Sequence, residues 1–180
     1  MKRIVKLTIL LSLFVQFGFA QTVKTEEEYK VIYDSIVSRL TLAEKDANDC
    51  IEKPFPKLVE LLDKYGMKII RVQLSNCDYQ KLYPQEVFGI SLTFTTDECY
   101  DFARTNDLQQ PYIIINFIES KPYEKASDLV KKYQGRFTKE VEEFYSDAVM
   151  KSIGFYFMDD MYSILYKTKK EKEEKEKNNK

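Results

Sequence analysis

The chain has 180 residues, and with 44% hydrophobic and 14% aromatic residues it is too apolar for a disordered protein. It contains no histidine, and its five glycines are scattered. These two facts exclude Ser-His-Asp and Cys-His-Asn triads, zinc sites built on imidazole, and glycine-rich phosphate loops. The net charge is −1, but the first 20 residues carry +3 and residues 167–180 another +3, so residues 21–166 carry about −7. Such an acidic region argues against a nucleic-acid-binding surface, which needs a basic patch.

The N-terminal segment has the pattern of a secretory signal. Three basic residues precede an apolar stretch, residues 9–19, and the small residue Ala20 follows it. A membrane anchor is the alternative, but the stretch is shorter than the roughly 20 residues that a spanning helix needs. We therefore expect a signal peptide over residues 1–20 and a mature chain that begins at Gln21. Export to the periplasm or the medium follows, with no integral membrane segment after cleavage.

Helices are expected first in the mature chain. Residues 25–40 place an apolar side chain at every third or fourth position, which predicts a helix, and Thr25 with Glu28 predicts a capping box at its start. A second helix is expected over residues 56–65, because a proline suits its first turn and Gly66 suits the left-handed position after its end.

Strands come next in the chain. Apolar and polar residues alternate over 68–74 and over 88–95, which predicts two half-buried strands. The polar side of the second strand consists of Gly89, Ser91, Thr93 and Thr95. A short helix, 97–106, and an apolar strand, 112–118, follow, and we expect this strand to be covered on both faces. Because strand, helix and strand follow one another, the pattern predicts that strands 88–95 and 112–118 are parallel, with a right-handed crossover.

The C-terminal part completes the predicted domain. Its pattern indicates helices at 122–133 and 138–152, strands at 155–158 and 161–166 in a closing hairpin, and a solvated, disordered Lys/Glu tail at 167–180. The predicted fold is therefore one α+β domain, residues 21–166. It is a mixed sheet of about five strands with helices packed on it, in the order ααββαβααββ.

Two groups of acids are candidate catalysts or calcium ligands. They are Asp97, Glu98 and Asp101 at a helix start, and Asp159 and Asp160 in a turn. Two carboxylates on opposite sides of a sugar bond would make a glycosidase, and carboxylate oxygens also suit calcium. Acids are common at helix starts and in turns, however, and neither group has the spacing of a calcium loop. The sequence therefore predicts no metal site, no cofactor and no catalytic residue.

The loop between the first two strands is the best candidate for a binding surface. Over residues 76–87 it is polar and carries Tyr79 and Tyr83 beside Pro84. A tyrosine combines an apolar ring with a hydroxyl group, which suits recognition. The alternative is that these rings pack beneath their own loop. We predict that Tyr79, Tyr83 and Pro84 contribute to binding.

Three cysteines lie in the mature chain, so at most one internal disulfide forms. If the second helix runs back along the first strand, Cys50 lies near the end of that strand, which leads to Cys77. A Cys50–Cys77 disulfide is therefore expected. Cys99 shares a helix face with Phe102 and Ala103, which predicts a buried free thiol.

These observations favour an exported, non-catalytic protein that binds another macromolecule, as inhibitors and immunity proteins do. The expected partner is another protein or a component of the cell envelope. Two alternatives stay open: a carboxylate-dependent hydrolase that acts on glycans, and a structural component of the envelope.

Overall fold

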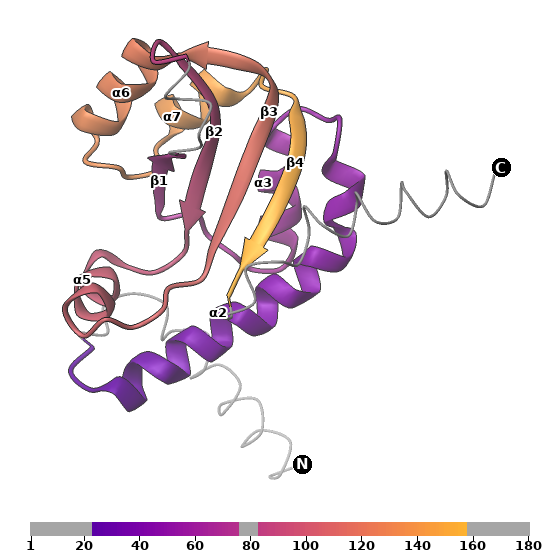
Figure 1. The fold of residues 1–180 in the computed structure, drawn as a ribbon. Coiled ribbons are helices and arrows are strands. Elements are labelled where there is room, and N and C mark those ends of the chain that lie inside the picture. The colour runs from indigo at the N-terminus through magenta and orange to yellow at the C-terminus, as the bar shows by residue number, and fades with distance from the viewer. Residues whose placement is uncertain (1–22, 76–82, 158–180) are drawn as a thin grey trace, which may run out of the picture.

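The computed structural model describes residues 23–75 and 83–157 (Figure 1). Its centre is a four-stranded sheet in the order β1-β2-β3-β4, in which every neighbouring pair is antiparallel. The strands are β1 (Arg71–Leu74), β2 (Glu86–Thr93), β3 (Tyr112–Pro122) and β4 (Met150–Tyr156). The helices are α2 (Glu26–Asp46), the 3-10 turn η1 (Ala47–Cys50), α3 (Pro56–Lys64), α5 (Asp97–Thr105), α6 (Tyr123–Lys132) and α7 (Lys139–Tyr145).

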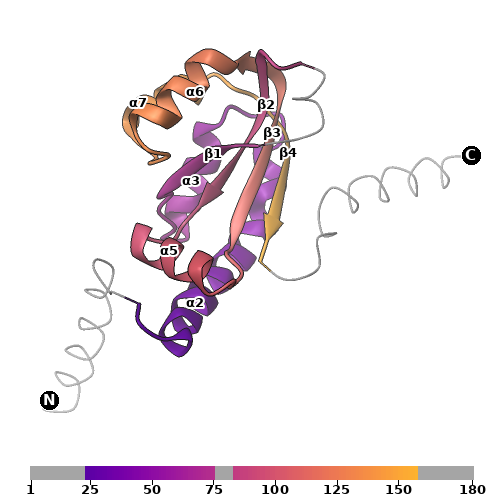
Figure 2. The same cartoon turned by 60° about the vertical axis from the view of Figure 1, so that its left-hand side comes forward.

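The helices lie mainly on one face of the sheet. The two views agree that α3, α6 and α7 lie on the same side and that the C-terminal half of α2 passes behind the sheet (Figures 1 and 2). Alternate strand residues enter this helical layer, and one row across all four strands is fully buried: Val72, Leu92, Ile113 and Phe155. Among the described elements, no helix covers the centre of the opposite face, which we call the open face.

The predicted α+β class is confirmed, and the described elements follow nearly the predicted order, with the 3-10 turn η1 added. The predicted mixed sheet of about five strands is not found: the described sheet has four strands and is antiparallel throughout. The start of α2 is also close to the prediction, because the Thr25 hydroxyl accepts a hydrogen bond from the Glu28 amide at 3.2 Å. The Glu28 carboxylate accepts in return from the amide of Lys24 rather than from that of Thr25. The predicted strand 161–166 and the tail 167–180 lie outside the described residues.

The predicted parallel pair is wrong, because β2 and β3 are antiparallel, with Thr93 opposite Tyr112. The prediction assumed that the helix between them crosses the sheet. Instead α5 lies at one end of the sheet beside the N-terminal half of α2 (Figure 1). Its apolar face, which includes Cys99 and Ala103, packs with Val23 and Tyr29 in a small second core. The helix buries its apolar side there, so the chain re-enters the sheet at the end that it left.

The expectation that the third strand is covered on both faces is also wrong. Exposure alternates along β3: Ile113, Ile115 and Phe117 are buried, whereas Tyr112 and Ile114 are only half-buried. This alternation is typical of an antiparallel sheet with helices on one side and solvent on the other. The apolar side chain of Ile114 thus lies on the open face.

The last predicted helix is too long. The pattern of Ala148 and Val149 continues the apolar stripe of α7, but the helix ends at Tyr145 and β4 begins at Met150. Tertiary hydrogen bonds hold this segment extended, since the amide of Phe55 donates to the Ala148 carbonyl at 2.9 Å and that of Ile118 to the Val149 carbonyl, also at 2.9 Å. The predicted start of the strand at residue 155 is therefore five residues late.

Candidate functional site

β2 presents only small residues to the open face: Gly89, Ser91 and Thr93. A trough lies over Ser91 and Thr93. Asn116 closes one end, because its side-chain oxygen fills the space at Gly89, where a Cβ atom would lie 2.8 Å from it.

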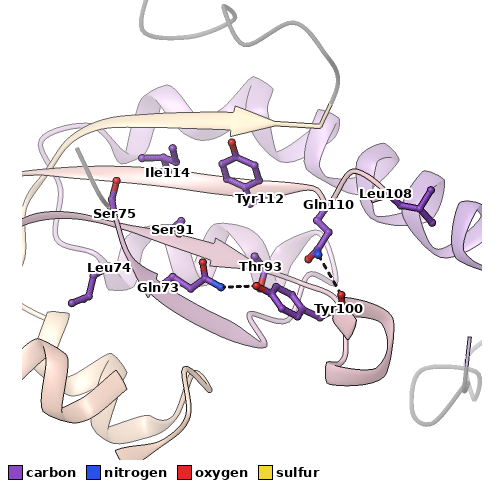
Figure 3. Close-up of a pocket in the computed structure, with 10 residues that line it drawn as sticks. All are labelled: Gln73, Leu74, Ser75, Ser91, Thr93, Tyr100, Leu108, Gln110, Tyr112 and Ile114. Carbon is purple, nitrogen blue, oxygen red and sulfur yellow. Dashed lines mark hydrogen bonds between the residues drawn. The ribbon is translucent and has the colours of Figure 1, made fainter. Parts of the chain in front are cut away.

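Two tyrosine rings form the walls at the other end. Tyr100 from α5 accepts a hydrogen bond from the Gln73 amide at 3.2 Å, and its ring centre lies 4.9 Å from the Arg71 guanidinium carbon (Figure 3). Tyr112 from β3 stacks on Tyr156 of β4, with ring centres 4.9 Å apart and planes 7° from parallel. Each ring is thus held from one side by a neighbour, which makes both walls rigid.

Between these walls the trough widens into a cleft of about 540 Å³. The residues that line it carry amide, hydroxyl and apolar groups: Gln73, Leu74, Ser75, Ser91, Thr93, Tyr100, Leu108, Gln110, Tyr112 and Ile114 (Figure 3). None of these side chains is charged at neutral pH. The volume lies within the range of about 300–1,000 Å³ that is typical of ligand sites.

Two polar atoms of the cleft residues are buried without a partner among the described residues. They are the hydroxyl oxygen of Thr93, a residue only 6% exposed, and the side-chain oxygen of Gln110. The amide nitrogen of Gln110 does have a partner, because it donates to the Tyr100 carbonyl at 3.4 Å. Unpaired buried polar atoms cost roughly 1–3 kcal/mol each, and in native proteins they call for an explanation such as function or an ordered water.

Only residues 83–87 of the predicted binding loop are described in the structure. Tyr79 lies outside the described residues. Tyr83 is 51% exposed and packs edge-on against Phe88, with ring centres 5.8 Å apart, and Pro84 is exposed as well. Neither Tyr83 nor Pro84 lines the cleft, whereas Ser75, which leads into the loop, does. The role of the loop in binding stays a prediction.

The sequence interpretation missed every residue of the cleft. The available signal was the polar side of the strand 88–95, where Gly89, Ser91 and Thr93 alternate with large apolar residues. Three small residues in succession on one face of an inner strand leave a hollow if the neighbouring strands carry larger side chains. Which side chains flank them, however, depends on the pairing with β1 and β3.

Asp97, one of the candidate catalytic acids, is stabilised as an ion. Burial raises the pKa of Asp97, but hydrogen bonds and charges from Arg71 and Arg136 outweigh it and lower the pKa below its usual value. Three exposed carboxyl groups also have pKa values lowered by hydrogen bonds from neighbouring side chains: Asp46, Glu140 and Asp147. A general acid needs a raised pKa, so these four groups are poor candidates. Asp159 and Asp160 lie outside the described residues.

Among residues 23–75 and 83–157, no three acids or cysteines lie close enough together to hold a metal ion.

A second cavity, of about 490 Å³, lies where the first two turns of α2 meet Leu108 and Gln109. Its acids include Glu26 and Glu27 in the first turn of α2, where the helix dipole already favours negative charge. We therefore take the cleft on the open face as the candidate site.

The cysteine predictions have separate outcomes. Cys99 is a buried free thiol, as predicted, and burial raises its pKa. Cys50 is a buried free thiol as well, and it donates to the Lys57 carbonyl at 3.7 Å. The structure therefore does not form the predicted Cys50–Cys77 disulfide, and Cys77 itself lies outside the described residues. Residues 52–55 bond to the β4 side of the sheet, whereas β1, which leads to Cys77, forms the opposite edge.

The chain matches no protein-family model, no curated protein and no solved structure. In the part that the structure describes, no helix has the length and apolar character needed to cross a membrane.

Proposed function

We propose that the chain is an exported, non-catalytic protein that binds a segment of another macromolecule in the cleft on its open face. The observation that carries this proposal is the uncharged lining of the cleft, which brings amide, hydroxyl and aromatic groups together without a carboxylate, lysine or cysteine. Such a lining offers hydrogen bonds and ring contacts to a ligand, but no group suited to move a proton near neutral pH.

The carboxylates also support binding over hydrolysis. Asp97 is the acid bonded to Arg71, next to the cleft, and it is engaged by two guanidinium groups. Its ionised form is stabilised, which is unfavourable for a glycosidase acid. No observation favours a purely structural role in the envelope.

A cleft-filling variant tests the proposal. Ser91 lies on the floor of the cleft, so Ser91→Leu extends an apolar side chain into the trough without entering the core. Lys151→Leu is the matched control, because it makes the same apolar addition at an exposed strand position outside the cleft. Circular dichroism checks that both variants fold.

The mature protein, immobilised, is exposed to the envelope fraction and the culture medium of the cells that make it. We expect the wild type and Lys151→Leu to retain the same macromolecule and Ser91→Leu to lose most of it. Equal retention by Ser91→Leu would show that the cleft is not the binding site.

Export is tested separately by the mass of the protein from its native compartment. The expected N-terminus is Gln21, because cleavage after Ala20 fits the small-residue rule of signal peptidases. A mass that still includes residues 1–20 contradicts the cleaved signal.

A further inference from the structure

We propose that the ligand of the cleft is an uncharged polysaccharide chain. This inference rests on the proposed function, because it names the class of macromolecule that the same site would hold.

The cleft is matched to a neutral ligand. Its lining carries no ionic group, and burial raises the pKa of Tyr156, so the tyrosine behind its wall stays protonated. Arg71, whose guanidinium packs on the Tyr100 ring, is bonded to Asp97 and to the Gln134 carbonyl, the latter at 3.0 Å. A charged ligand would therefore lose hydration on entering the cleft without gaining an opposite charge.

The polar groups of the cleft match hydroxyl groups in particular. Five residues that line it carry a hydroxyl, which both donates and accepts, and two carry an amide with separate donor and acceptor atoms: Ser75, Ser91, Thr93, Tyr100, Tyr112, Gln73 and Gln110. A sugar hydroxyl also donates and accepts, so it can satisfy such a mixed lining.

The two rings supply the apolar contact that a sugar needs. A pyranose ring carries hydroxyls at its rim and C–H groups on its faces, and it packs well against an aromatic ring that is held in place. Tyr112 is held by stacking on Tyr156, and Tyr100 by the guanidinium of Arg71. Both tyrosines line the cleft together with the apolar side chain of Ile114.

A polypeptide fits this site less well. Extended peptides are usually bound by adding a strand to a sheet edge, through unpaired backbone groups. The floor of the cleft is β2, an inner strand whose partners are β1 on one side and β3 on the other. Its backbone groups are used within the sheet, so the floor of the cleft offers side chains alone to a ligand.

Affinity electrophoresis through gels that contain one polysaccharide each tests the inference. The neutral probes are xylan, mannan and a β-1,3-glucan, and the charged probes are alginate and polygalacturonate. A synthetic peptide of Ser, Asn and Gly, measured by calorimetry, represents a neutral polypeptide. Gln73→Leu removes the amide from the cleft at similar volume, and Gln85→Leu makes the same change at an exposed position outside it.

We expect at least one neutral polysaccharide to retard the wild type. Gln73→Leu should weaken this binding about tenfold, the effect of losing a hydrogen bond to the ligand, while Gln85→Leu leaves it unchanged. Because neither partner is charged in the site, the affinity should be the same at low and high salt.

The inference is overturned if no neutral polysaccharide binds, or if Gln73→Leu binds as well as the wild type. It is also overturned if only charged polysaccharides bind and high salt abolishes their binding. Binding of the synthetic peptide that Ser91→Leu abolishes would also overturn the polysaccharide inference, but it would leave the proposed function standing. Native capture and polysaccharide binding that are both unaffected by Ser91→Leu would reject the two together.

Discussion

Gly89 allows β2 and β3 to approach closely because it has no side chain. A Cβ atom at this position would lie 2.5 Å from the carbonyl oxygen of Ile115, a backbone atom that cannot move aside cheaply. We expect Gly89→Ala to lower the free energy of unfolding by about 1–3 kcal/mol, the usual cost of overpacking. Gly154→Ala is the control, because the atoms nearest to its Cβ would all belong to a side chain, that of Tyr156, the closest at 2.8 Å, and not to the backbone. Urea denaturation measures both, and an equal loss in the two variants contradicts the argument.

Thr93 and Thr95 allow the effect of a buried hydroxyl on stability to be separated from its effect on ligand binding. Both residues are buried, and both hydroxyl oxygens are without a partner among the described residues, but only Thr93 lines the cleft. Replacing either by valine keeps the shape and removes an unpaired polar atom, so we expect each variant to be more stable by about 1 kcal/mol. Thr93→Val alone should bind the cleft ligand more weakly. Thermal denaturation and the capture assay check this, and weaker binding by Thr95→Val would contradict the distinction.

At the scale of elements, α5 links the small second core to the cleft. Its N-cap, Thr96, accepts a hydrogen bond from the Cys99 amide at 3.4 Å, and one turn further on it presents Tyr100 to the cleft. Thr138 caps α7 in the same way, also at 3.4 Å, but α7 has no residue in the cleft.

Loss of either cap should therefore destabilise the fold, and only one loss should affect binding. We expect Thr96→Ala and Thr138→Ala each to lower the free energy of unfolding by about 1 kcal/mol. Thr96→Ala should in addition weaken ligand capture, because the position of Tyr100 depends on α5. Denaturation and capture are measured on both variants. Equal capture by the two variants would show that α5 positions the wall independently of its cap.

The element scale also explains what the sequence could predict. Local patterns located α3, β2 and the start of α2 well, because amphipathic periodicity and proline or glycine signals act within one element. They ended α2 at residue 40, whereas the helix continues to Asp46. The direction of β3 was missed because it depends on where α5 buries its apolar face, which is determined by tertiary packing. The start of β4 was missed because Ala148 fits a helical stripe as well as a strand, and only its bond to Phe55 decides. The cleft is formed across three strands, so no local pattern contains it.

At the scale of the whole molecule, charge is segregated from the candidate site. The described residues pair several acids with lysines or arginines on the surface, while the cleft itself is neutral. The ion pair network of Asp97 with Arg71 and Arg136 is the nearest such group, and it joins β1, α5 and the segment before α7. Because these ion pairs lie at this junction, protonation of Asp97 at low pH should lower the stability of the whole domain.

The sign of this pH dependence follows from the lowered pKa of Asp97. The folded state binds the proton less readily than the unfolded chain, whose aspartate pKa is about 3.9. The contribution of Asp97 to stability is therefore fully present above about pH 4 and is lost as the pH falls through the lower folded value.

We expect the difference in unfolding free energy between the wild type and Asp97→Asn to be largest at neutral pH and to shrink in acid. Glu98→Gln controls for the loss of one negative charge at the start of α5, and urea titrations over the acid range measure all three proteins. A difference between the wild type and Asp97→Asn that stays constant from neutral pH into acid would show that the two arginines do not stabilise the Asp97 carboxylate in the folded state.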